Sequence, residues 1–207
     1  MKKICMLLGL ILSSATALAV DGDPEAGKAK SITCAACHGT DGNSAIPLNP
    51  KIAGQHAGYL YKQLEEFKLA SQTGGKEGRN NAVMNGMAAP LSEQDMKDLA
   101  AYFASQDLKI GAAPEDVIAQ GEALYRGGDA ERGITACIAC HGPGGKGMNL
   151  AGFPVIGGQH AQYTEQQLKM FRSGERNNDL NGMMRGVSSK LTDEDIRILS
   201  AYLEGLH

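Results

Sequence analysis

The sequence feature that most constrains this chain is an internal duplication with a period of about one hundred residues. Segment 34–39 (CAACHG) recurs at 137–142 (CIACHG), segment 50–59 (PKIAGQHAGY) recurs at 154–163 (PVIGGQHAQY), and segment 91–95 (LSEQD) recurs at 191–195 (LTDED). A period of this length corresponds to a whole domain, because solenoid repeats are only about 20–50 residues long. The sequence therefore predicts two homologous domains, at 20–110 and 111–207, that meet at a linker within 106–114.

Residues 1–19 have the three parts of a secretory signal peptide. A basic start at 1–3 precedes an apolar run at 4–12, and a small-residue cleavage motif (ALA) stands at 17–19. The apolar run is too short to span a bilayer, which takes about 20 residues. We therefore expect export to the periplasm and a mature chain that begins near Val20, with Cys5 removed and four cysteines retained.

Charge and composition exclude some function classes. Loss of the two signal lysines changes the formal net charge from −3 to −5, so the mature chain lacks the basic footprint of a nucleic-acid binder. Aromatic residues make up only 5% of the chain and tryptophan is absent, which leaves little bulky material for hydrophobic cores. Either the domains are small or something other than side chains fills them.

The local patterns predict an all-α fold. Segments 23–25 (DPE) and 114–116 (PED) are typical of helix starts, with proline early and acids in the first turn. Apolar residues follow helical spacing in 59–67 and again in 163–171. Ser92 and Thr192 each precede an aspartate by three residues, in the manner of a capping box that opens a terminal helix. The glycine-rich segments 71–87 and 142–158 are predicted to be long loops.

The four retained cysteines lie in two Cys-x-x-Cys-His motifs, which are the attachment signature of c-type haem. Two thiols add across the two vinyl groups of the porphyrin, and the adjacent histidine coordinates iron from one face. The predicted attachment residues are Cys34, Cys37, Cys137 and Cys140, and the predicted proximal iron ligands are His38 and His141. Two such motifs in register predict two covalent haem groups, which also supply the missing core material.

Other uses of the cysteines fit less well. A four-cysteine zinc site has pairs about 15–20 residues apart, far less than the separation here, and leaves both histidines unexplained. A thioredoxin-like redox pair needs a βαβ context, and no segment alternates as a strand. Two simple disulfides are the plainest alternative.

The duplication selects a second iron ligand in each half. Counted back from the terminal helices, the repeat runs without a gap and places Met84 on Met184. This is the only methionine pair that matches, so we predict Met84 and Met184 as the sixth ligands. A competing alignment matches 85–87 (NGM) with 181–183 (NGM) and favours Met87 and Met183, but it needs a gap before the terminal helix.

A duplicated histidine and a duplicated proline also bear on the site. His56 and His160 are alternative sixth ligands, or else solvent-facing residues at a helix start. Pro50 and Pro154 follow the proximal histidines by twelve and thirteen residues. A carbonyl at such a position can accept the Nδ1–H of the proximal imidazole and fix the ring. The alternative is an ordinary loop proline.

With these motifs, the chain resembles the bacterial dihaem cytochromes of the cytochrome c4 family over essentially its whole mature length. The resemblance rests on both CxxCHG segments, on 41–44 (DGNS), on the Gly-Gln segments, on 184–186 (MRG) and on the closing 202–207. It implies two class I cytochrome c domains, with a methionine sixth ligand and a proline carbonyl on the proximal histidine in each. The family's ligands carry over onto His38 and Met84 in the first half and onto His141 and Met184 in the second.

The resemblance also implies where helices meet and where the halves differ. The first and last helices of each half are expected to cross at a small residue, with Gly27 against Tyr102 and Gly121 against Tyr202. Extra length at 130–135, before the second motif, is expected to leave the haem chemistry intact and to affect the domain interface.

The predicted function is one-electron transfer rather than enzymatic catalysis, because two filled axial positions leave no site for substrate. The resemblance implies a periplasmic carrier in a respiratory chain, with peripheral membrane association. A quinol-oxidising complex or another donor would supply electrons, and a haem-copper terminal oxidase would accept them. The alternatives are the electron-accepting haem subunit of a sulfur-compound dehydrogenase, or a dihaem peroxidase, which needs one open iron position.

Overall fold

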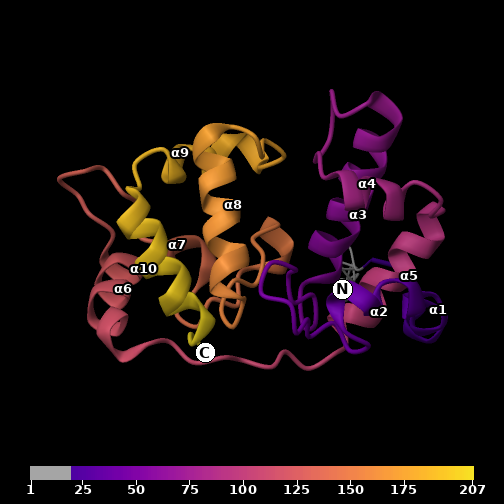
Figure 1. Cartoon of the computed structure of the whole chain (residues 1–207), viewed down its shortest axis with the longest axis horizontal. Coiled ribbons are helices and arrows are strands. Elements are labelled where there is room, and N and C mark those ends of the chain that lie inside the picture. The colour runs from indigo at the N-terminus through magenta and orange to yellow at the C-terminus, as the bar shows by residue number, and fades with distance from the viewer. Residues whose placement is uncertain (1–19) are drawn as a thin grey trace, which may run out of the picture.

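The computed structural model describes residues 20–207, so the predicted signal peptide at 1–19 lies outside the described residues. The chain forms two helical halves that lie side by side, and an extended linker runs along one edge between them (Figure 1). Within 20–207 there is no named β-strand, only isolated bridges between Asp129 and Ile134 and between Met148 and Phe153. The predicted all-α class is confirmed. No helix of the described part is long and apolar enough to cross a membrane.

The two halves contain the same order of α-helices and differ in their short 3-10 helices. The N-terminal half contains α1 (Pro24–Lys30), the 3-10 helix η1 (Ser31–Thr33), α2 (Ala35–His38), α3 (Ala57–Thr73), α4 (Ala82–Ala88) and α5 (Glu93–Ala104). The C-terminal half contains α6 (Glu115–Gly127), α7 (Ile138–His141), the 3-10 helix η2 (Asn149–Ala151), α8 (Ala161–Ser173), the 3-10 helix η3 (Leu180–Gly182), α9 (Met183–Ser188) and α10 (Asp193–Glu204). The first helix packs on the last in each half, α1 on α5 and α6 on α10.

The helix starts follow from their caps. The Asp23 carboxylate accepts the N–H groups of the first turn of α1, and proline stands at the first helical position. Ser92 and Thr192 form the predicted capping boxes: each hydroxyl accepts the N–H of an aspartate three residues on, whose carboxylate accepts the cap residue's N–H. These reciprocal bonds satisfy donors that the helix itself leaves free.

Two glycines set the closeness of the helix crossings. A Cβ at Gly27 would lie 2.1 Å from the carbonyl oxygen of Asp98 and 2.8 Å from Cβ of Tyr102. A Cβ at Gly121 would lie 2.5 Å from Cβ of Tyr202. The expected pairs of glycine and tyrosine are therefore confirmed, and only glycine permits these crossings without moving a helix.

Two expectations about loops are wrong in part. Segment 71–87 is not one loop, because α3 continues to Thr73 and α4 starts at Ala82, where the Asn81 side chain accepts the N–H of Met84. A helix of two turns is too short to show a clear period. The extra length at 130–135 forms a hairpin on the outer side of its own half (Figure 1), where Arg132 pairs with Asp195, so it does not reshape the interface.

Candidate functional site

The two Cys-x-x-Cys-His motifs occupy the short helices α2 and α7. In each, the first cysteine is the N-cap and the histidine is the last helical residue. A glycine with positive φ follows each histidine, Gly39 at 79° and Gly142 at 72°, and turns the chain away from the motif. The four cysteines are free thiols. The duplicated motifs therefore form matching local structures with their thiols available for covalent attachment.

Burial favours the uncharged thiol at the first cysteine of each motif. It raises the pKa of the Cys34 thiol, and it raises that of Cys137 to about 11. Groups of three or more histidine, cysteine or acidic residues that could hold a bare metal ion are absent from 20–207. This arrangement gives no support to the zinc alternative.

Each motif histidine is fixed by a proline carbonyl. Nδ1 of His38 lies 2.9 Å from the carbonyl oxygen of Pro50, and Nδ1 of His141 lies 3.0 Å from that of Pro154. A carbonyl oxygen only accepts, so Nδ1 carries the proton and Nε2 is left as a free electron pair. Burial lowers the pKa of both histidines, and the bond to proline only partly opposes this effect. The predicted proline contacts are therefore present, and they orient two neutral imidazoles.

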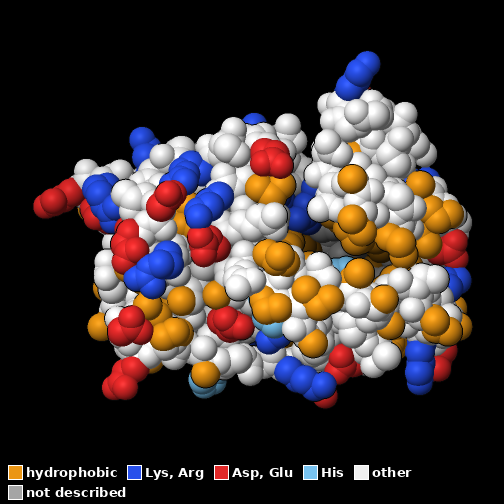
Figure 2. Space-filling model, viewed as in Figure 1, with side chains coloured by type: hydrophobic (Ala, Val, Ile, Leu, Met, Phe, Trp, Pro, Cys, Tyr) orange, Lys and Arg blue, Asp and Glu red, His pale blue; other side chains and the backbone are white. Residues whose placement is uncertain are grey.

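The histidines face a single large cavity of about 1670 Å³ that extends through both halves. Figure 2 shows hydrophobic side chains gathered around a hollow in the N-terminal half. The cavity brings together all the predicted attachment and axial residues: Cys34, Cys37, His38, Met84, Cys137, Cys140, His141 and Met184. Its apolar wall includes Phe67, Phe103 and Phe171. A cavity of this size between short helices, with thiols and imidazoles on its wall, fits two haem groups.

Five methionines line the cavity. One of them is Met170 on α8, and exposure separates the other four. Met87 is 38% exposed and Met183 is 37% exposed. Met84 on α4 and Met184 on α9 are only partly exposed. The pair chosen by the ungapped duplication is thus the better sheltered pair, as suits a thioether that is to contact a buried iron.

The duplicated histidines His56 and His160 lie outside this cavity wall. Nε2 of His56 is 2.9 Å from the carbonyl oxygen of Lys146, and Nε2 of His160 is 2.8 Å from that of Ser44. Each imidazole therefore bonds to the opposite half of the molecule. Neither histidine is a simple solvent-facing residue, and neither lines the cavity that contains the motif histidines. This placement gives no support to bis-histidine ligation of the iron.

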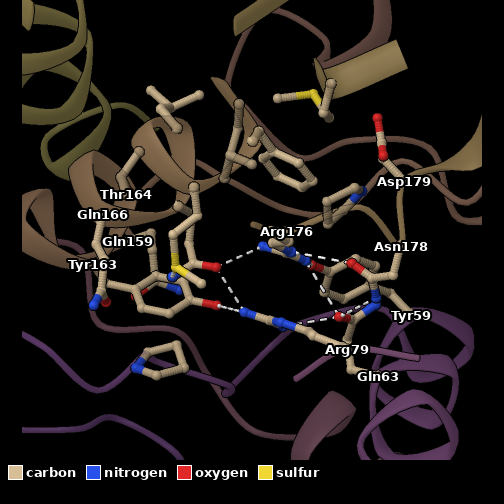
Figure 3. Close-up of a pocket in the computed structure, with 18 of the residues that line it drawn as sticks. Tyr59, Gln63, Arg79, Gln159, Tyr163, Thr164, Gln166, Arg176, Asn178 and Asp179 are labelled. Atoms are coloured by element: carbon tan, nitrogen blue, oxygen red, sulfur yellow. Dashed lines mark hydrogen bonds between the residues drawn. The ribbon is translucent and has the colours of Figure 1, made fainter. Parts of the chain in front are cut away.

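A polar cluster between the halves was missed by the sequence reasoning (Figure 3). Arg79 donates to Gln63 in its own half at 2.8 Å and to Tyr163 and Gln167 in the other at 3.0 and 2.7 Å. Arg176 in the C-terminal half makes the same kinds of contact with the halves exchanged. Arg176 donates to Gln167 at 2.9 Å and crosses to Tyr59 and Gln63 at 2.8 and 3.2 Å. The signal was a repeated tripeptide, RNN, at 79–81 and 176–178.

The two arginines also bear on what the cavity holds. Arg176 is only 6% exposed, and both guanidiniums line the cavity. Each stacks on a phenylalanine of its own half, Arg79 on Phe67 and Arg176 on Phe171. In the described part of the chain neither has a carboxylate within salt-bridge distance. Because a buried charge needs compensation, this pair fits the carboxylates that haem carries as propionates.

Comparisons with known proteins agree with this geometry. A family model described as Cytochrome c matches the chain twice, over 25–107 and 118–207. Cytochrome c4 of Stutzerimonas stutzeri is 50% identical over 210 residues, which cover all of both chains. The thiosulfate dehydrogenase electron acceptor of Thiomonas intermedia (strain K12) is 38% identical, over 95% of this chain and 86% of its own. The crystal structure of reduced recombinant cytochrome c4 from Pseudomonas stutzeri matches with a TM-score of 0.87 and 51% identity, covering 90% of this chain and 100% of that one.

Proposed function

We propose that this chain, which belongs to the cytochrome c4 family, carries single electrons along a periplasmic respiratory chain toward a haem-copper terminal oxidase. It is a dihaem electron carrier rather than an enzyme, with one covalent haem c in each cytochrome c domain. Its partners are other redox proteins. A quinol-oxidising complex is the proposed donor, and peripheral contact with the membrane is proposed to bring the carrier to both.

The proposed iron ligands are one histidine and one methionine in each half: His38 with Met84, and His141 with Met184. The proposed covalent attachment residues are Cys34, Cys37, Cys137 and Cys140. Pro50 and Pro154 hold the proximal rings, since their carbonyls accept the Nδ1–H groups. Such a bond fixes the ring and makes the imidazole a more basic ligand.

One observation carries the assignment: in each half, a neutral buried imidazole and a sheltered methionine line the same apolar cavity. An iron with both axial positions filled has no place for substrate, so it can only gain or lose an electron. A thioether ligand favours ferrous iron, and burial penalises the extra charge of ferric iron, so both raise the reduction potential.

The absorption spectrum of the ferric protein tests the ligands. We expect two low-spin haems and the far-red band that is typical of a methionine–iron bond. Met84→Ala and Met184→Ala should each remove about half of this band, because each half contributes one such bond. Met87→Ala and Met183→Ala are the matched controls and should leave it unchanged. Loss of the band in a control variant, with retention in Met84→Ala, would refute the assignment.

A second candidate function rests on the 38% identity to a thiosulfate dehydrogenase electron acceptor. In that case the donor would be a sulfur-compound dehydrogenase. Rapid-mixing measurements separate the two functions. The oxidase hypothesis predicts that reduced protein is oxidised by a haem-copper oxidase at a rate that rises with oxidase concentration. Rapid reduction by thiosulfate dehydrogenase, with no reaction with the oxidase, would favour the second function.

The proposed location has its own test. If residues 1–19 are a cleaved export signal, the protein recovered from the periplasm should begin near Val20. N-terminal sequencing of that fraction measures this directly. Recovery of the haem protein in the cytoplasm with Met1 intact would contradict the proposal.

A further inference from the structure

The duplicated Gln-His pair has a structural role at the interface between the halves. Gln55 is 7% exposed, and its side-chain amide bonds twice to the backbone of Val155. Nε2 donates to the Val155 carbonyl at 2.8 Å, and Oε1 accepts the Val155 N–H at 2.9 Å. Gln159 makes the same two bonds to Lys51, each at 2.8 Å. The two halves therefore make the same contact with their roles exchanged, as in a two-fold interface.

The residue that each glutamine holds is next to a proximal proline. Val155 follows Pro154, whose carbonyl accepts the Nδ1–H of His141 at 3.0 Å. The C=O of Pro154 and the N–H of Val155 belong to one peptide unit. This unit therefore accepts from His141 on one side and donates to Gln55 on the other.

The N-terminal half contains the same arrangement. The peptide between Pro50 and Lys51 accepts from His38 at 2.9 Å and donates to Gln159 at 2.8 Å. Each hydrogen-bonded chain thus begins at the histidine of one half and ends at the glutamine of the other. In an isolated half, water would have to take the place of the glutamine.

We propose that Gln55 and Gln159 are positioning residues that act across the interface. Each glutamine strengthens the hydrogen bond between the proximal histidine of the opposite half and its proline carbonyl. This rests on the proposed role of His38 and His141 as iron ligands. An acceptor on the N–H of an amide makes its carbonyl a stronger acceptor, because hydrogen bonds in a chain polarise one another. A stronger bond to Nδ1–H makes the imidazole more basic. A more basic imidazole favours ferric iron, so each half tunes the other's potential.

The fixed amide is a better partner than water. The two hydrogen bonds of the glutamine amide hold the peptide in one orientation. Unlike water, the amide does not have to reorient when the iron changes charge. Gln55 and Gln159 also accept the N–H groups of His56 and His160 at 3.0 and 3.1 Å, which fixes both amides at the starts of α3 and α8. The interface therefore connects the starts of α3 and α8 to the loops that contain Pro154 and Pro50.

The test replaces Gln55 with leucine in the full dihaem protein. The Nδ1–H proton resonances of both histidines are followed in the reduced, diamagnetic state, together with the potential of each haem. Gln55→Leu should move the His141 resonance to higher field, because its hydrogen bond weakens, and leave His38 nearly unchanged. The ratio of reduced to oxidised C-terminal haem should rise about two- to threefold at fixed potential. For one electron this equals roughly 20–30 mV.

Three further variants complete the experiment. Gln159→Leu should act on His38 and spare His141. Gln55→Glu keeps the acceptor for the Val155 N–H, so the His141 resonance should stay or move to lower field. His56→Leu is the matched control, since it removes a contact across the same interface without touching either proximal peptide. It should leave both resonances in place.

The crossed pattern is what distinguishes this role from simple loosening of the interface. A Gln55→Leu effect on His38 as large as on His141 would overturn the proposal, as would no shift at either. If Gln55→Leu does not fold, Gln159→Leu decides in the same way, with His38 as the resonance that should move. A wild-type protein without the far-red band would refute the methionine ligands of the proposed function, while the histidine resonances would still report whether the coupling is crossed.

Discussion

The crossing of α6 and α10 allows one perturbation to be worked out in detail. Gly121 on α6 meets Tyr202 on α10, inside the core of the C-terminal half. In Gly121→Ala, the new Cβ would lie 2.5 Å from Cβ, 2.8 Å from Cγ and 3.1 Å from Cδ2 of Tyr202. Carbon atoms prefer separations of about 3.5–4.0 Å. Because the backbone of α10 fixes the tyrosine Cβ, no rotamer change relieves the closest contact.

The helices must therefore separate by about 1 Å, which loosens the surrounding core. Overpacking of this kind costs about 1–3 kcal/mol, and three simultaneous close contacts place Gly121→Ala near the upper end. Alanine returns about 1 kcal/mol of helix propensity relative to glycine. The expected net loss in the free energy of unfolding is about 2 kcal/mol.

Gly127→Ala is the matched control, because Gly127 ends the same helix and a Cβ there has nothing within 4 Å. It should be neutral or stabilise by up to about 1 kcal/mol. Far-ultraviolet circular dichroism during heating of the dihaem protein provides the assay. At roughly 4–8 °C per kcal/mol for a small domain, Gly121→Ala should lower the melting temperature by about 8–16 °C. Equal melting temperatures for the two variants would refute the close contact between Gly121 and Tyr202.

Two further predictions concern ion pairing and the linker. Arg132 holds the pKa of Asp195 at about 2, below its ordinary 3.8, so the pair stabilises the fold above about pH 4 and that contribution is lost as pH falls toward about 2. Asp195→Asn should lower stability at neutral pH and flatten the acid-unfolding curve in this window; an unchanged curve would contradict the pairing. The ammonium of Lys51, buried at 8% exposure, donates to the carbonyls of Lys109 in the linker at 2.6 Å and of Gly158 at 3.1 Å. Lys51→Leu leaves those carbonyls unpaired at a cost of about 1–3 kcal/mol. Limited proteolysis should therefore cut the linker 106–114 faster in this variant. An unchanged cleavage rate would show that Lys51 does not hold the linker in place.

Features encoded by neighbouring residues could be predicted from the sequence. The caps at Asp23, Ser92 and Thr192 depend on groups three residues apart, so their patterns are local. The haem motifs are equally local. The duplication added information of longer range, because it paired the sheltered Met84 with Met184 out of five methionines on the cavity wall.

Features that depend on how the halves meet could not be predicted. Arg79 and Arg176 lie in a polar region without helical or strand period, and their offset differs from that of their partners Gln63 and Gln167. Only the docked halves show that each arginine bonds across the interface. The short helix α4 was hidden for another reason: its start depends on the Asn81 cap, and two turns give little periodic signal.

The meaning of the repeated Gln-His pair follows from the symmetry of a duplicated chain. A residue that occurs once per domain has two possible uses: it serves its own domain twice, or it serves an interface in which both copies make the same contact. Gln55 and His56, and likewise Tyr59 and Gln63, all recur at one constant offset, and their counterparts lie across the interface. In a two-fold interface each contact appears twice with the halves exchanged. Repetition within a chain therefore identifies interface residues as readily as cofactor ligands, and the free Nε2 of a histidine, rather than its recurrence, separates His38 from His56.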